Sequence, residues 1–214
     1  MLRETPTHIR AVLFDFGGVI AEEGFKQGLR ALAKAQQLDP DEVMNEGREA
    51  VHDSGYVTGT GTEADFWTLL RERTGLRGED KELSQAILDR FIVRQWMIEQ
   101  VARLRNAGLI VAILSDQTDW LDYLDQRLHF SAAFDRVFNS FHLGKSKCDP
   151  TLFDDAVQML GVQPGETLFV DDDAGHVERA RNCGLHAIHF TERDVFEAQL
   201  LSLLGESAVA EQSG

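Results

Sequence analysis

The stretch Val12-Leu13-Phe14-Asp15-Phe16-Gly17-Gly18-Val19-Ile20 places one carboxylate between an apolar run and a pair of glycines. The residues before Asp15 are rich in strand formers, so we expect a strand over Ile9–Phe16. In an open α/β sheet, chemistry collects just beyond the carboxyl ends of the strands. Asp15 is therefore a candidate functional residue, although Asp-x-Gly-Gly is also good turn chemistry and could serve only to open a turn.

Two later segments repeat this pattern. Leu109–Leu114 is an apolar run that ends in Ser115-Asp116, and Thr167–Val170 is another that ends in Asp171-Asp172-Asp173. The segment Gly144–Pro150, which lies between them, is basic in an otherwise acidic chain. We expect the carboxyl ends of these strands to bring the carboxylates, the hydroxyl and the lysines to one edge of a sheet.

A nucleophilic carboxylate, a hydroxyl, a lysine and a carboxylate cluster together make a phosphoryl-transfer site. Asp15 would attack phosphorus and form an aspartyl-phosphate. Ser115 and Lys147 would hold the phosphoryl oxygens. The acidic run Asp171–Asp173 would hold Mg²⁺, which prefers hard oxygen ligands, although acidic runs are more often solvated loops.

The rest of the chain divides by its periodicity. From about Glu22 to Arg94 the pattern is helical only, and from Met97 onward helices alternate with apolar strands, which is typical of a parallel sheet with right-handed crossovers. The helices expected are Phe25–Leu38, a second one starting at Pro40, Phe66–Arg73, Lys81–Ile92, Met97–Ala107, Pro150–Leu160, Val177–Cys183 and Phe190–Leu204.

The order of these motifs resembles that of the haloacid dehalogenase-like hydrolase superfamily. The four matching segments are Phe14–Ile20, Leu114–Asp116, Lys147–Pro150 and Phe169–Asp173. Each motif is weak alone, but all four occur in the right order. The branch that the chain resembles includes small sugar-phosphate phosphatases similar to α-D-glucose-1-phosphate phosphatase and to the phosphatase domain of soluble epoxide hydrolases.

The resemblance implies an α/β fold with a Rossmann-like parallel sheet covered by helices on both faces. Residues 1–20 and 95–214 would form this core. Residues 21–94 would form an all-helical cap that closes over the site, although these helices could instead only brace the core. Residues 205–214 lack large apolar groups and are expected to be a flexible tail.

The resemblance also implies the metal ligands. They would be Asp15, the backbone carbonyl of Gly17 and, as the first choice in the acidic run, Asp172. Asp171 would bind directly, through water, or only anchor the site. Asp173 starts the following helix and could serve only as its cap.

For the phosphoryl group, the resemblance implies the hydroxyl of Ser115, the backbone N–H of Asp116 and the ammonium group of Lys147. Lys145 is also basic, but the register of the family's Lys-x-Asp-Pro pattern favours Lys147.

The chain departs from the family pattern at three positions. Asp116 and His176 stand where asparagine is common. Gly17 stands two residues after the nucleophile, where many phosphatases of the superfamily carry an aspartate as general acid and base. General acid–base catalysis is typically worth ~10²–10⁴ in rate. With glycine at this position, the enzyme would be weak, would act on substrates with easy leaving groups, or would take its general acid from elsewhere.

Composition limits the class of partner. The chain has 214 residues and a net charge of −15, which argues against nucleic acid and against anionic membranes. The partner expected is a small phosphorylated molecule, and the oligomeric state is not predicted. The two cysteines give no disulfide framework, and no segment resembles a signal peptide, so we expect a cytoplasmic protein.

Three functions fit the sequence. The first is a Mg²⁺-dependent phosphatase of small phosphorylated metabolites, with sugar phosphates favoured. The second is a metal-free 2-haloacid dehalogenase, in which Asp15 attacks carbon; such enzymes usually carry an aromatic residue where Gly17 stands. The third is a non-catalytic binding module that keeps the fold, which Gly17 and Asp116 would permit.

Overall fold

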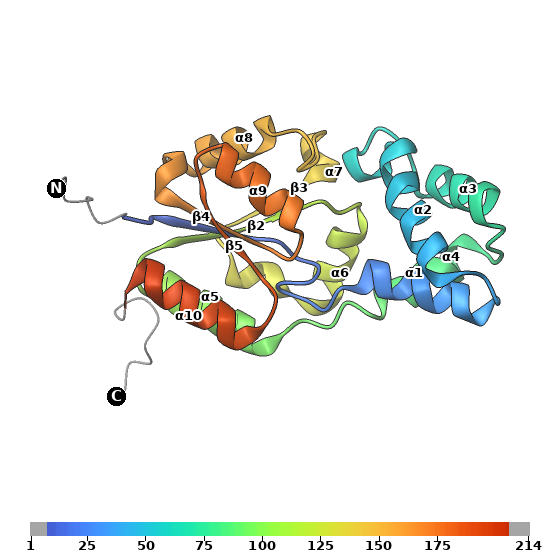
Figure 1. Cartoon of the computed structure of the whole chain (residues 1–214), viewed down its shortest axis with the longest axis horizontal. Coiled ribbons are helices and arrows are strands. Elements are labelled where there is room, and N and C mark those ends of the chain that lie inside the picture. The colour runs from blue at the N-terminus through green and yellow to red at the C-terminus, as the bar shows by residue number, and fades with distance from the viewer. Residues whose placement is uncertain (1–7, 206–214) are drawn as a thin grey trace.

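The computed structural model describes residues 8–205 and has a five-stranded parallel sheet at its centre (Figure 1). The strands lie in the order β3-β2-β1-β4-β5. They are β1 (Ala11–Phe14), β2 (Ile110–Ser115), β3 (Arg136–Asn139), β4 (Thr167–Asp171) and β5 (His186–His189). The expected parallel α/β fold is confirmed, and β1 occupies the middle of the sheet.

Helices cover both faces of the sheet. One face carries α5 (Gln95–Asn106), α6 (Trp120–Leu128) and α10 (Arg193–Leu204), and the other carries α8 (Thr151–Leu160) and α9 (Ala174–Asn182) (Figure 1). Because successive strand residues point to opposite faces, Val12 and Phe14 join the first hydrophobic cluster, and Ala11 and Leu13 join the second. A central strand buried on both faces explains why the sequence before Asp15 is continuously apolar.

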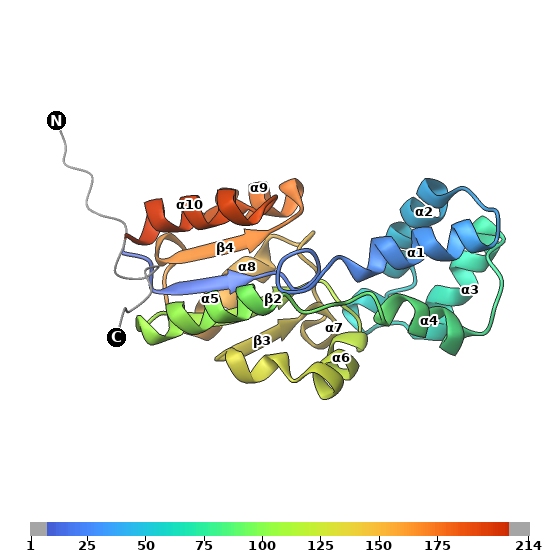
Figure 2. The same ribbon diagram turned by 90° about the horizontal axis from the view of Figure 1, so that it is seen from below.

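Four helices form a separate bundle beyond the carboxyl end of β1 (Figure 2). They are α1 (Gly24–Ala35), α2 (Pro40–Asp53), α3 (Glu63–Thr74) and α4 (Asp80–Leu88), with the 3₁₀ turn η1 (Tyr56–Thr58) between α2 and α3. Helix α1 packs against α2 and α4, and α2 packs against α3. The bundle helices pack on one another, their buried side chains continue the hydrophobic cluster on one face of the sheet, and the bundle lies beyond the end of the sheet.

Two chain segments connect the bundle to the sheet, and they pair with each other. Ala21 forms an isolated antiparallel bridge with Val93. The N–H of Glu22 donates to the carbonyl of Ile92 at 2.9 Å, and that of Arg94 donates to Ile20 at 2.8 Å. The polypeptide therefore leaves the core and returns to it at one place.

Several expected element boundaries differ from the structure. The first strand covers Ala11–Phe14 rather than Ile9–Phe16, and the last helix starts at Arg193 rather than Phe190. The sequence did not predict β3, an edge strand of four residues of which two are exposed, so it offers too little alternation to read.

Helix α6, the short helix α7 (Ser140–Leu143) and the 3₁₀ turns η2 (Phe130–Ala133) and η3 (Pro164–Glu166) were also not predicted. The tail expected over residues 205–214 lies, beyond Gly205, outside the described residues. Among residues 8–205, no helix has both the length and the apolar character needed to cross a membrane.

Candidate active site

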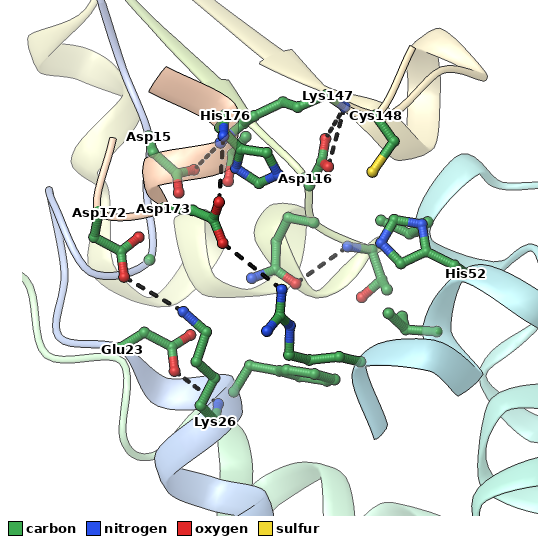
Figure 3. Close-up of a pocket in the computed structure, with 18 of the residues that line it drawn as sticks. Asp15, Glu23, Lys26, His52, Asp116, Lys147, Cys148, Asp172, Asp173 and His176 are labelled. Carbon is green, nitrogen blue, oxygen red and sulfur yellow. Dashed lines mark hydrogen bonds and ion pairs between the residues drawn. The ribbon is translucent and has the colours of Figure 1, made fainter. Parts of the chain in front are cut away.

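The ends of three neighbouring strands open into one pocket (Figure 3). Asp15 follows β1, Ser115 is the last residue of β2, and Asp171 is the last residue of β4. The pocket is lined by residues of the core and of the helical bundle: Asp15, Gly17, Glu23, Phe25, Lys26, Arg48, Val51, His52, Val57, Ser115, Asp116, Gln117, Thr118, Lys147, Cys148, Asp172, Asp173, His176 and Arg179. The structure thus brings the residues of all four sequence motifs together.

Lys147 is the centre of the charged network. Its side chain is 0 % exposed, and its Nζ lies 2.9 Å from Oδ1 of Asp15 and 2.6 Å from Oδ2 of Asp171. Burial alone would lower the pKa of Lys147, but the carboxylates of Asp15 and Asp171 outweigh it and raise that pKa above its ordinary value. Lys147 is therefore a fixed ammonium group between two strand ends.

Lys145, the other lysine of the basic segment Gly144–Pro150, lies elsewhere. The Nζ of Lys145 is 2.5 Å from the Asp155 carboxylate and 3.0 Å from the Thr151 hydroxyl, in a partly exposed cluster at the start of α8. Lys145 does not line the pocket. The two lysines therefore have different partners: Lys147 contacts the expected nucleophile Asp15, and Lys145 does not.

Asp116 holds the loop that carries Lys147. Its two carboxylate oxygens accept the backbone N–H of Lys147 at 2.8 and 3.0 Å. This contact gives a physical reason for an acidic residue at a position where the family pattern has asparagine. The side chain of Asp116 therefore positions the lysine, while its backbone N–H remains the group expected to meet phosphate.

Asp15 sits in an environment that opposes its charge. Its pKa is raised to about 7, chiefly by burial and also by the carboxylates of Asp171 and Asp172, while Lys147 acts in the lowering direction. Oδ1 of Asp15 also accepts the backbone N–H of Phe16 at 2.7 Å. A further cation beside Asp15 would favour the ionised, nucleophilic form.

Three carboxylates lie close enough to share such a cation. One oxygen each from Asp15, Asp171 and Asp172 lies within 4.8 Å of the others. Carboxylate oxygens are the donors that Mg²⁺ prefers, so this donor set fits a hard divalent cation. Asp15 is 9 % exposed and Asp171 is fully buried, so the cluster is not an ordinary solvated acidic loop.

The carboxylate of Asp171 is already engaged on both oxygens. Oδ1 accepts the N–H of Asp173 at 2.7 Å, and Oδ2 faces Lys147 at 2.6 Å and Nδ1 of His176 at 3.3 Å. Burial alone would raise the pKa of Asp171, but Lys147 and His176 hold it well below its ordinary value. Asp171 therefore stays ionised and anchors Lys147.

The second glycine of the first motif is required by close packing. Gly18 has φ of +82°, and a Cβ placed on it would lie 2.5 Å from Cγ of Asp172. Only glycine adopts this conformation without strain and leaves room for the carboxylate. Gly18 thus lets the loop after Asp15 pass directly beside the fourth motif.

The sequence did not identify the charged residues that the helical bundle contributes to the pocket. Lys26 of α1 places its Nζ 3.4 Å from Oδ2 of Asp172, and Arg48 of α2 lies 3.7 Å from Asp173 (Figure 3). Helical periodicity shows which residues face the bundle core, but it cannot show which polar residues face another part of the chain. These contacts could be found only from the structure.

The loop Tyr56–Gly59, which contains the 3₁₀ turn η1, contacts the core. The Tyr56 hydroxyl donates a hydrogen bond to the Asp119 carboxylate, and the Ser140 hydroxyl donates to the carbonyl of Val57 at 2.7 Å. Burial and Asp119 raise the pKa of Tyr56 above its ordinary value. Val57 lines the pocket, so this docking fixes one of its walls.

A family model described as haloacid dehalogenase-like hydrolase matches residues 9–184. The chain belongs to this family. The resemblance found in the four motifs is therefore confirmed, and the protein is a hydrolase of the haloacid dehalogenase-like type.

Curated relatives include a phosphatase of similar length. The chain is 24 % identical over 184 residues to D-ribitol-5-phosphate phosphatase of Bacteroides thetaiotaomicron, covering 82 % of this chain and 89 % of that protein. It is also 24 % identical over 219 residues to Bifunctional epoxide hydrolase 2 of Sus scrofa. That match covers 92 % of this chain but spans only 39 % of the larger relative.

Solved structures with this fold include two kinds of enzyme. A family enzyme from Bacteroides thetaiotaomicron in complex with magnesium and inorganic phosphate has a TM-score of 0.63 and 21 % identity, covering 86 % of this chain and 94 % of that one. L-2-haloacid dehalogenase from Xanthobacter autotrophicus has a TM-score of 0.62 and 22 % identity, covering 91 % and 83 %. These similarities establish the fold.

Proposed function

We propose that this hydrolase is a Mg²⁺-dependent phosphatase of small phosphorylated metabolites, with sugar phosphates as the favoured class. The observation that carries the proposal is the cluster of the Asp15, Asp171 and Asp172 carboxylates, together with the buried ammonium group of Lys147 that contacts the first two. A dianionic phosphate needs positive charge beside the nucleophile, and in a chain of net charge −15 that charge must be built locally. The similarity to a ribitol-phosphate phosphatase supports the same assignment.

In the proposed first step, an oxygen of Asp15 attacks phosphorus, and the bond from phosphorus to the leaving oxygen breaks. Lys147 stabilises the charge on the nucleophile and on the phosphoryl oxygens. Ser115 and the backbone N–H of Asp116 hold the phosphoryl group. Water then attacks phosphorus, the bond to Asp15 breaks, and phosphate leaves, so that the carboxylate is restored.

We propose that Asp15, Asp172 and the carbonyl of Gly17 hold the metal ion. Asp171, whose oxygens are both engaged, would bind it through water or only anchor the site. A bound Mg²⁺ would supply electrostatic stabilisation of the phosphoryl oxygens. The ion would also favour the ionised form of Asp15, which burial otherwise disfavours.

The helical bundle is proposed to be the cap, formed by residues 21–94, over a core of residues 1–20 and 95–214. Its contacts with the fourth motif, through Lys26 and Arg48, support this division. A cytoplasmic location also stays a proposal; Cys148 and Cys183 are free thiols.

The deciding experiment is hydrolysis of sugar phosphates, aryl phosphates and 2-haloacids by the purified protein, each with Mg²⁺ and with a chelator. We expect phosphate release that requires Mg²⁺. Asp15→Asn should abolish it, whereas the control Asp155→Asn, which alters only the exposed pair with Lys145, should keep it. Metal-independent release of halide would establish a dehalogenase instead, and no turnover of any substrate would favour a binding module.

A further inference from the structure

The space beside Gly17 contains a carboxylate from another part of the chain. A Cβ placed on Gly17 would lie 3.7 Å from Oε1 of Glu23 and 3.4 Å from the ring of Phe91. Gly17 stands two residues after Asp15, at the position where many phosphatases of this family carry an aspartate that acts on the leaving group. Oε1 of Glu23 therefore lies next to the volume that such a side chain would fill.

The orientation of Glu23 is fixed by the start of α1. Glu23 is the N-cap residue of this helix, and its Oε2 accepts the backbone N–H of Lys26 at 2.8 Å. Because one oxygen caps the helix, the other is left on the side of Gly17. Glu23 and Lys26 both line the pocket that contains Asp15 (Figure 3).

We infer that Glu23 is the general acid and base of this enzyme, in place of the aspartate that Gly17 cannot supply. The inference rests on the proposed phosphatase activity. When Asp15 attacks phosphorus, the electron pair of the breaking bond goes to the leaving oxygen, which takes the proton of Glu23. In the second step the Glu23 carboxylate takes a proton from the water that attacks the aspartyl-phosphate.

The environment of Glu23 suits a proton donor. Its burial raises its pKa above the ordinary value, and this effect outweighs the neighbouring Lys26, which acts in the opposite direction. The Nζ of Lys26 is directed instead to Asp172. A glutamate with a raised pKa is protonated more often near neutral pH and is a better general acid.

The test is Glu23→Gln, because the glutamine carbonyl oxygen can still accept the N–H of Lys26 and keep the cap while it removes the transferable proton. Turnover would be measured with Mg²⁺ on phosphoesters graded by the pKa of the leaving group. We expect kcat for alkyl phosphates to fall by about 10²–10³. Nitrophenyl phosphate, whose leaving group departs unaided, should lose far less, so the dependence on leaving-group pKa should become steeper.

Glu22→Gln is the matched control, since it removes the same charge from the neighbouring residue. Glu22 pairs with Arg94 at 3.0 Å and does not line the pocket. We expect its leaving-group dependence to equal that of the wild type. An equal loss on all phosphoesters in Glu23→Gln, or no loss, would overturn the assignment of Glu23.

Gly17→Asp in the Glu23→Gln background provides a rescue. Gly17 does not have a positive φ, and the nearest contact of its added Cβ is an ordinary one with Phe91. We expect part of the alkyl-phosphate turnover to return. A folded double variant that is no better than Glu23→Gln would show that the acid does not act from this place. If the wild type cleaves neither alkyl nor aryl phosphates, the proposed phosphatase function fails first, and this role fails with it.

Discussion

Replacing Lys147 by methionine should destabilise the fold as well as lower turnover. The side chain is fully buried and contacts two carboxylates, at 2.9 Å from Asp15 and 2.6 Å from Asp171. Methionine is a similarly unbranched side chain, one atom shorter, that removes the ammonium group. Removal of one partner of a buried ion pair typically costs about 3–5 kcal/mol, because the other charge is left uncompensated.

The lower end of that range applies near neutral pH, because Asp15 can escape the penalty. Its pKa is already raised to about 7, so without Lys147 it will take up a proton. Asp171 keeps the N–H of Asp173 and the imidazole of His176 as partners. We therefore expect Lys147→Met to lower the free energy of unfolding by about 3 kcal/mol at neutral pH.

The sign of the pH dependence follows from the same pKa shifts. The attraction lost with Lys147 exists only while the carboxylates are ionised, and protonation of Asp15 below about pH 7 removes part of it. The difference in stability between wild type and Lys147→Met should therefore be larger at about pH 8 than at about pH 5.5.

The assay is urea unfolding of both metal-free proteins at these two pH values, with Lys145→Met as the matched control. Lys145 is partly exposed and pairs with Asp155 outside the pocket, so its replacement should change neither stability nor turnover measurably. Equal stability losses in the two variants, or a loss that does not depend on pH, would refute the account of Lys147 as the buried counter-charge.

Two further predictions concern the metal site and the cap. Because the pKa of Asp15 is raised to about 7, protons should compete with Mg²⁺ for its carboxylate. The affinity of the protein for Mg²⁺, measured by calorimetry, should therefore weaken as the pH falls below about 7. Asp15→Asn should remove this pH dependence. Tyr56→Phe leaves the carboxylate of Asp119 without the phenol hydroxyl, so the unfolding free energy measured in urea should fall by about 1 kcal/mol; an unchanged value would show that this contact does not hold the loop.

The sequence predicted those features that depend on neighbouring residues. The strand before Asp15 was readable because a strand buried on both faces is continuously apolar. The helix expected over Phe66–Arg73 is present as α3, which starts three residues earlier, at Glu63, after a capping box in which the side chains and backbone N–H groups of Thr62 and Asp65 bond reciprocally. The four sequence motifs could be placed at one edge because the carboxyl ends of parallel strands lie at the same edge of a sheet.

The features that the sequence did not predict depend on contacts between distant residues. Lys26 and Asp172 are separated by 146 positions, and nothing local to either residue indicates the other. The same holds for the hydroxyl of Tyr56 and the carboxylate of Asp119, which lie on different parts of the fold. Helical periodicity predicted the bundle but not the face that it turns toward the pocket.

The two glycines of the first motif illustrate both kinds of constraint. Gly18 is fixed by sterics, because its φ is +82° and an added Cβ would meet Asp172 at 2.5 Å. Gly17 is under no such constraint, since its φ is not positive and the nearest contact of an added Cβ is 3.4 Å away. The backbone therefore does not exclude an aspartate at position 17, and the reason for glycine must lie in what surrounds it. Glu23 already directs a carboxylate to that place, and a second one beside it would add like-charge repulsion to a site that already concentrates three carboxylates.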